Sequence, residues 1–412
     1  MTAPGKLIRL GDVCRIEHGY AFKGEDMQEG GEGPIVVNIG NFRYDGGFRF
    51  DSTRIQRTLA PYPKSFELAP DDIILIMTCQ TPGGEILGVP ARIPGNGRTY
   101  LHNQRMGKVV ITQPGKVDAD YLYYLFLSQA FNQHLTKTAT GSKILHTAPG
   151  RIESYCFNCP AIDEQRSVGR ALRAIDDLIE NNRRRIRLLD EAIRILFDKW
   201  IVSKYQQAEL ACDAIPPSWS SSPASSVATY LNGYAFKPDD FSADGVPIIK
   251  IRELKSGVDA STPRYEGDLD EKYRVRAGDL LFSWSADLNV YIWAGDDGWL
   301  NQHLFVVRPV RGIPTSYLYL ALAHAMPKFR ALSNGATMKH IKRSALDQVS
   351  LLIAPPELRD HFASVADPMI ELSIRLSRRN ATLRKLRDLL LPKLLSGEID
   401  VSRLPLPPEE PA

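Results

Sequence analysis

The chain contains the same ordered pattern twice, and this duplication constrains its fold more than any other feature. The string "LGDVCRIEHGYAFKGEDM" starts at Leu10 and "SSVATYLNGYAFKPDDF" starts at Ser225, so "GYAFK" occurs at Gly19 and again at Gly233. A repeat with so long a period is typical of a duplicated module. The chain is therefore predicted to contain two similar globular units.

The order of elements inside the two copies also agrees. Runs rich in β-branched residues, "GPIVVNIGNF" and "VPIIKIREL", predict one strand, and "DDIILIMT" and "GDLLFSWS" predict another. An Asn-Gln pair follows, then an apolar helix with two tyrosines, then a loop and a strand that ends at a proline. This mixture of strands and helices predicts two modules of the α/β (α+β) class.

Each module is followed by a long segment with a heptad pattern. Apolar residues recur there in alternating steps of four and three, which is typical of a coiled-coil seam. One polar residue, Asn182 in the first segment and Arg379 in the second, fills a gap at an equivalent heptad position, where it would fix register at some cost in stability. The predicted seam includes Ile179, Asn182, Ile186 and Leu189, and Leu376, Arg379, Leu383 and Leu386.

We expect these two helices to pair antiparallel, because one chain carries both and a folded module lies between them. The pair would relate the modules by a pseudo-twofold axis, and about 40 residues of helix would span about 60 Å. Pro368 is expected to bend or restart the second helix. Two ordinary amphipathic core helices are the alternative.

Domain boundaries follow from these patterns. We expect a first module over 1–162, a first helix over 163–205, a second module over 206–356 that opens with a Pro- and Ser-rich linker over 206–223, a second helix over 357–398 and a disordered tail over 399–412.

Composition excludes a membrane protein more firmly than it identifies a partner. Of 412 residues, 43% are hydrophobic and 24% charged, and no apolar run reaches the length of a membrane span. Without the layout of a secretion signal, the chain is expected in the cytoplasm. The net charge of +3 does not by itself indicate nucleic acid binding.

The "CFNC" string at Cys156 and Cys159 lacks the second ligand pair of a zinc site, so no metal site is predicted. Alignment of the two copies puts these cysteines opposite Leu351 and Ala354, which favours a buried strand.

Two similar heads suit a ligand with two similar sites at fixed spacing, and duplex DNA is such a polymer. The module–helix–module–helix order, "LGDV", the repeated "GYAFK", "CPAIDEQ" or "APPELRD" after each module, and the late "LLPKLLSGEIDV" together resemble the specificity subunit of a type I restriction-modification system. The resemblance covers essentially the whole chain.

The resemblance implies two target recognition domains, each of which reads half of a split, asymmetric DNA sequence. The helices would set the spacing and dock two copies of a modification subunit, which uses S-adenosylmethionine to methylate adenine; restriction subunits can join. By this resemblance the chain is a non-catalytic recognition subunit that binds no cofactor of its own.

The sequence offers little chemistry of its own. No Gly-rich cofactor loop or Asn/Asp-Pro-Pro-aromatic site for a target base is present. Asp239, Glu253 and Lys255 mimic a metal-dependent nuclease pattern, which leaves a single-chain nuclease as one alternative. A protein-binding scaffold without a DNA role is the other.

Candidate DNA contacts come from three places that occur in both copies. Arg, Lys, Asn and Gln suit base edges, and small polar or cationic side chains suit phosphates. The aromatic residues of "GYAFK" are interpreted as shared scaffold, since a feature common to both heads can hardly encode their difference. The candidates are Lys23, Asn103, Gln104, Arg105, Ser142, Lys143 and His146 in the first module, and Lys237, Asn301, Gln302, His303, Thr337, Lys339, His340 and Lys342 in the second.

Overall fold

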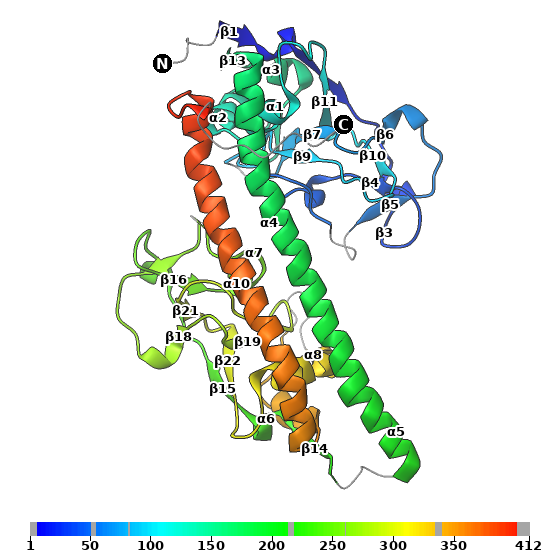
Figure 1. The fold of residues 1–412 in the computed structure, drawn as a ribbon, viewed down its shortest axis with the longest axis vertical. Helices are drawn as coiled ribbons and strands as arrows, with labels where there is room; N and C mark the ends of the chain where they lie inside the picture. Colours follow the sequence, from blue (N-terminus) through cyan, green and yellow to red (C-terminus); the bar gives the residue numbers. More distant parts are fainter. Residues whose placement is uncertain are drawn as a thin grey trace. The chain divides into compact units, whose positions relative to one another are not determined.

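The structure, a computed structural model, describes residues 6–50, 55–80, 83–212, 218–259, 261–333 and 340–401. The chain divides into two compact units, which we call unit 1 (Met1–Asp177 with Arg384–Ala412) and unit 2 (Leu178–Leu383). The boundary falls inside both long helices, α4 (Ile162–Phe197) and α10 (Pro356–Leu395), so each unit contains a part of each helix (Figure 1).

Unit 1 is built on a four-stranded antiparallel sheet in the order β2-β11-β7-β9, beside a five-stranded sheet in the order β3-β5-β4-β10-β6. Its strands are β1 Lys6–Arg9, β2 Cys14–His18, β3 Met27–Glu29, β4 Ile35–Val36, β5 Gln56–Thr58, β6 Glu67–Leu68, β7 Ile73–Ile76, β8 Thr78–Cys79, β9 Pro90–Arg92, β10 Tyr100–Leu101, β11 Met106–Ile111, β12 Leu145–His146 and β13 Cys156–Cys159. Its own helices are α1 Ala119–Phe126, α2 Gln129–Thr138 and α3 Pro149–Glu153.

Unit 2 repeats this plan with the four-stranded antiparallel sheet β15-β22-β19-β20 and a second sheet β17-β16-β21-β18. Its strands are β14 Ser220–Pro223, β15 Ala228–Asn232, β16 Val246–Ile249, β17 Arg264–Tyr265, β18 Arg274–Val275, β19 Leu280–Ser283, β20 Asn289–Ile292, β21 Gly298–Leu300, β22 Leu304–Pro309 and β23 Ser350–Ile353. Its helices are α6 Ala224–Val227, α7 Ile251–Ser256, α8 Thr315–Ala331 and α9 Ala345–Gln348.

The two plans correspond in their main strands, although the described residues form thirteen strands in unit 1 and ten in unit 2. In each unit the second sheet contains one parallel pair, β4 with β10 and β16 with β21, and an outer antiparallel pair joins the first strand to the last, β1 with β13 and β14 with β23. The predicted duplication of a mixed α and β module is therefore confirmed.

A buried tyrosine helix covers the core of each unit. Tyr121 and Tyr124 of α1 are almost fully buried in unit 1, as is Tyr317 of α8 in unit 2. The hydroxyl of Tyr317 donates to the carbonyl of Leu352 at 2.8 Å, which ties α8 to β23. Each phenol thus finds the partner that a buried Tyr requires.

The two long helices run antiparallel in unit 2. In unit 2 the rings of Phe197 and Phe362 lie 5.6 Å apart, whereas Asn182 hydrogen-bonds to Asn380, so positions that rise along α4 fall along α10. In unit 1, Arg387 of α10 contacts Asp176 of α4 at 2.9 Å.

The seam of α4 follows the predicted pattern. Ile179 is 2% exposed and Asn182 is 1% exposed, and Ile186 and Leu189 are half-buried. Helix continues beyond the predicted end at residue 205, through a π-helical turn at Asp198–Val202 and α5 at Ser203–Cys212. Residues 206–212 of the predicted linker are thus helical, and residues 220–223 form β14, which pairs with β23.

The seam of α10 keeps Leu376 and Leu383 as predicted but differs by one residue at the other two predicted positions. Arg379 is exposed and its neighbour Asn380 is buried; ten residues after Leu376, Leu386 is 44% exposed and Arg387 is 5% exposed. The steps after Leu376 run four, three, four through Asn380 and Leu383 to Arg387, instead of three, four, three. Two adjacent polar residues at the gap leave both phases open to hydrophobic periodicity.

Arg387 is buried because three carboxylates surround it. Its guanidinium lies 2.9 Å from Asp176 and Asp388 and 3.9 Å from Asp45, and Asp176 also accepts a hydrogen bond of 2.9 Å from the hydroxyl of Tyr124. This network joins α10, α4, α1 and the 43–50 segment inside unit 1. A buried cation needs such partners, since an unpaired one would lose its hydration without compensation.

Two further predictions about the second helix and the tail are corrected. Helix α10 is continuous through Pro368, so the restart expected there as one of two outcomes does not occur. The predicted tail begins too early, because Ile399 packs against the core of unit 1 and Val401 is 4% exposed. Residues 402–412 of that tail lie outside the described residues.

The buried amide pair makes the seam testable. Asn182→Leu is expected to lower the free energy of unfolding by roughly 1–3 kcal/mol, since it leaves the Asn380 oxygen buried without its donor. The double variant Asn182→Leu/Asn380→Leu should recover most of that loss, because both partners become apolar. Urea unfolding measures both, and Arg379→Leu, which changes an exposed neighbour, is the control with an effect within about 0.5 kcal/mol. An equal loss in the control variant would contradict the observed phase of α10.

Candidate nucleic-acid interface

The repeated "GYAFK" segment is held by the Asn-Gln segment in the same way in both units. The amide of Tyr20 donates to the carbonyl of His102 at 2.7 Å, and Gln104 donates back to Tyr20 at 2.9 Å. In unit 2, Tyr234 donates to Leu300 at 2.8 Å and Gln302 donates back at 2.9 Å. This pairing forms a backbone clamp that is the same in both copies.

The clamp explains why glycine opens the phrase. A Cβ on Gly19 would lie 2.2 Å from the carbonyl oxygen of Asn103, and one on Gly233 would lie 2.2 Å from that of Asn301. No side chain fits such an approach of two backbones. The phrase is therefore a structural requirement, as the interpretation of "GYAFK" as scaffold expects.

Asn103 and Asn301, which were predicted as DNA contacts, belong to this clamp. They are 8% and 5% exposed, and each side-chain oxygen accepts a bond of 3.3 Å from the amide two residues later, that of Arg105 or of His303. The nearby His102 donates from Nε2 to the carbonyl of Met106 at 2.8 Å, and its burial lowers its pKa. The accessible members of the segment are Gln104 and Arg105, which are exposed, and Gln302 and His303, which are half-buried.

The end of the central strand gathers the other candidate segments. After β7, the amide of Met77 donates to the carbonyl of Arg105 at 3.0 Å, and its carbonyl accepts from Thr147 at 2.9 Å. After β19, the amide of Trp284 donates to the carbonyl of His303 at 3.4 Å, and the carbonyl of Trp284 accepts from the amide of Ile341 at 3.0 Å. We call this the strand-end junction; it consists of Met77, Thr78, Arg105 and His146 in unit 1, and of Trp284, Ser285, His303 and His340 in unit 2.

The predicted histidines occupy matching positions at the junction. His146 pairs with Thr78 in an antiparallel bridge, and His340 pairs with Ser285. Thr78 Oγ1 lies 3.1 Å from His146 Nδ1, within hydrogen-bond distance. These two bridges show that the backbone pairing of the two copies matches at this junction.

A tight hairpin presents Ser142 and Lys143 beside the junction of unit 1. Thr140 and His146 exchange backbone bonds of 2.9 and 2.8 Å that close the hairpin, and both tip residues are exposed. Gly141 has φ +103° and a Cβ there would meet the Ile144 carbonyl, so the turn needs glycine. Thr337 and Lys339, the corresponding candidates of unit 2, lie outside the described residues.

Several predicted cations at the interface have no acidic partner. Among the described residues, the side chains of Arg105, Lys143 and Lys342 form no ion pair and are exposed. Lys23 is 74% exposed and lies 3.8 Å from Glu25, and Lys237 is exposed beside the turn Pro238–Asp240. Exposed cations without neutralising carboxylates are suited to phosphate contacts.

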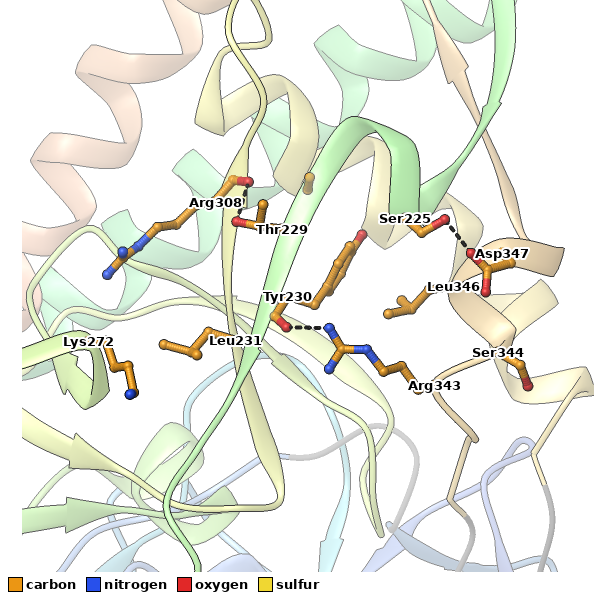
Figure 2. A pocket seen from close by; sticks show the side chains of 11 residues that line it. Ser225, Thr229, Tyr230, Leu231, Lys272, Arg308, Arg343, Ser344, Leu346 and Asp347 are labelled. Atoms are coloured by element: carbon orange, nitrogen blue, oxygen red, sulfur yellow. Dashed lines mark hydrogen bonds between the residues drawn. The ribbon is translucent and has the colours of Figure 1, made fainter. Parts of the chain in front are cut away.

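Sequence reasoning missed a basic hollow in unit 2. A surface hollow of about 720 Å³ is lined by Lys272, Arg308 and Arg343 together with Tyr230 and Asp347 (Figure 2). Arg343 donates to the carbonyl of Tyr230 at 3.0 Å, and Ser225 donates to Asp347 at 2.6 Å. The three cations come from separate segments, so no local pattern in the sequence could have joined them.

The nuclease pattern does not assemble. The side chain of Glu253 is fully buried, where it accepts from the amide of Lys250 at 3.1 Å and from Arg252 at 2.8 Å. Lys255 is paired with Asp287 at 3.0 Å, and Asp239 lies in a separate turn. Glu253 is thus a capping and ion-pair residue, and the nuclease alternative has no support.

The interpretation of "CFNC" as core is wrong for Cys156, which is exposed; Cys159 is half-buried. In β13 the buried residue is Phe157, just as Leu351 is in β23, so the alignment slipped by one residue. A slip of one residue moves every side chain of a strand to the other face. Across the described residues, no group of three His, Cys, Asp or Glu side chains could hold a metal ion. None of the described helices is long and apolar enough to cross a membrane.

Two copies of one module, each with exposed cations near its strand-end junction, fit a nucleic-acid-binding protein. A family model for the type I restriction modification DNA specificity domain matches residues 5–190 and 216–363. Since these matches span most of the sequence, the chain belongs to this family.

Individual relatives agree with the family. The type I restriction enzyme MjaIX specificity subunit of Methanocaldococcus jannaschii is 22% identical over 312 residues, which cover 72% of this chain and 72% of the relative. The HindI specificity subunit of Haemophilus influenzae is 21% identical over 401 residues, with 77% and 86% covered. A solved S subunit of a type I restriction-modification system from M. genitalium has the same fold, with a TM-score of 0.53 at 13% identity and 94% and 95% coverage.

The clamp predicts that alanine substitutions at two nearby glycines differ in their effect on stability. Gly19→Ala should lower the free energy of unfolding of unit 1 by roughly 1–3 kcal/mol, because its Cβ forces two backbones apart. Gly24→Ala should change it by less than about 0.5 kcal/mol, since no atom lies within 4 Å of its Cβ position. Denaturant unfolding, monitored by the far-UV signal of the backbone, compares the two variants. Equal effects would rule out the clamp as the reason that glycine opens "GYAFK".

Proposed function

We propose that this chain is the DNA-recognition subunit of a type I restriction-modification complex. Unit 1 and unit 2 each read one half of a split, asymmetric target, and the chain itself performs no chemistry. Family membership supports the general assignment. The observation that carries the two-part reading is the strand-end junction, where one backbone frame occurs twice with different side chains.

The frame separates the tasks of the residues. Backbone bonds at Met77 and Trp284 fix the same geometry in both units, while the exposed Arg105 is replaced by the half-buried His303. Two readers with equal frames and unequal contact residues suit two different half-sites. Exposed lysines, including Lys143 and Lys342, anchor the phosphates that flank each half-site.

The paired helices are proposed to set the spacing of the half-sites. Their register is fixed by the buried Asn182–Asn380 bond at 2.9 Å. A fixed register prevents α4 from sliding along α10, which a constant gap between half-sites requires. The same helices dock two copies of an adenine-modifying subunit that binds S-adenosylmethionine, and restriction subunits can join the complex. The chain acts in the cytoplasm, where it binds genomic DNA.

Methylation in the source cell tests this function. Deletion of the gene should abolish adenine methylation at one split motif with a constant gap, and reintroduction should restore it at the same motif. Methylation that is unchanged in the deletion strain, in a strain whose modification subunit is expressed, would count against the proposal.

Salt dependence tests the phosphate contacts directly. Lys143→Ala and Lys342→Ala should each weaken binding to all duplexes alike and reduce the log–log slope of affinity against salt by about 1, since each removes one phosphate contact. Lys116→Ala is the matched control, because Lys116 is exposed, carries the same charge and follows the other end of β11. Fluorescence anisotropy with a labelled duplex measures the slope, and a control slope that falls equally would contradict the assignment.

A further inference from the structure

We infer that Arg105 in unit 1 and His303 in unit 2 occupy one common base-reading station, and that each determines one base pair of its half-site. This inference rests on the proposed function and adds to it the residues that distinguish the two heads. It assigns Arg105 to a guanine in the major groove.

Three backbone bonds hold the station in the same place in both units. The carbonyl of the station residue accepts from the central strand, at 3.0 Å from Met77 and 3.4 Å from Trp284. Its amide donates to the side-chain oxygen of Asn103 or Asn301, at 3.3 Å in each unit. The next amide, that of Met106 or Leu304, donates to the carbonyl of the same asparagine at 2.9 or 3.0 Å.

A station held on both sides positions its side chain without help from a ligand. The backbone cannot shift without breaking bonds to the core strand, so the side chain starts from a defined point. Recognition groups on such rigid supports lose little entropy when they bind. The buried Asn103 and Asn301, which first looked like DNA contacts, therefore act as positioning residues for their neighbours.

The side chain of Arg105 is available for base contact. It is exposed, and it forms no ion pair within the described part of the chain. A guanidinium offers two parallel donors, which match the O6 and N7 acceptors of guanine and of no other base in the major groove. An arginine already paired with an acidic neighbour could not offer these two donors.

His303 offers less at the same station. Its ring lies 5.6 Å from that of Trp284, and its Nδ1 is buried without a hydrogen-bond partner. Only the other ring nitrogen is left for a base edge, so unit 2 reads this position through one contact. The two heads therefore differ in both the base they prefer and the strength of the preference.

The neighbouring residues are weaker choices. Gln104 and Gln302 are the same residue in both units, so they cannot encode a difference between half-sites. His146 is engaged with Thr78 at 3.1 Å, and Lys143 lies on a hairpin tip suited to phosphate. The station occupied by Arg105 and His303 combines two properties. Its side chain differs between the two units, and its backbone hydrogen bonds are the same in both.

The experiment selects duplexes from a randomised library with the full-length chain and its variants, and sequences the enriched pool. Arg105→Ala should lose the preference at one guanine of one half-site by roughly 10- to 100-fold and leave the other half-site unchanged. Arg105→Lys should weaken the same preference while it keeps the salt slope, because an ammonium lacks the planar pair of donors of the guanidinium. Lys116→Ala is the charge-matched control and should keep both half-sites.

The reciprocal exchange completes the test. Arg105→His should weaken its position in the first half-site, and His303→Arg should introduce guanine preference in the second. If Arg105→Ala instead weakens all sequences equally, Arg105 is a phosphate contact and the inference is overturned while the proposed function stands. If the unaltered chain enriches no sequence and shows no salt-dependent binding, the proposed function fails and the inference fails with it.

Discussion

The hydrogen bond between the buried amides of Asn182 and Asn380 is the constraint on which the helical seam depends. In a seam of leucine and isoleucine, several registers bury similar apolar area, so apolar contacts alone select weakly among them. An amide pair tolerates one register, because any shift leaves two polar groups buried without partners. Asn380 also donates to the carbonyl of Ile179 at 3.2 Å, which ties the pair to the backbone of α4. In unit 1, the contact of Arg387 with Asp176 also joins α10 to α4.

Much of the fold could be predicted from the sequence because the chain states it twice. The succession of strands along the chain and the tyrosine helices came from comparing two copies, in which random similarity is filtered out, and the α4 seam came from its heptad spacing. Errors arose where position had to be known to one residue. Periodicity could not choose between Arg379 and Asn380, and it had no means to expect that Arg387, a cation, is buried by three carboxylates. The "CFNC" strand failed for the same reason, since period-two patterns reverse with a single slip.

The candidate interface was partly visible and partly hidden. Pairs such as Asn103 and Asn301 were found because they repeat, yet repetition selects for the frame, and burial shows that these amides support the turn. Residues that distinguish the heads repeat least, so they are the hardest to find by comparing copies. The basic hollow of unit 2 was missed because Lys272, Arg308 and Arg343 are brought together only by folding. Comparing the two copies therefore identified the residues that hold the turn better than the residues proposed to contact DNA.

This division between support and contact also explains how one module can serve two targets. The core strand, the glycine clamp and the buried asparagine fix the backbone, and an exposed side chain on that frame contributes little to stability. Arg105 and His303 can thus differ in charge, size and hydrogen-bonding capacity at no evident cost to the turn, whose bonds differ by at most 0.4 Å between units. When stability and recognition reside in different atoms, a change of target requires no change of fold.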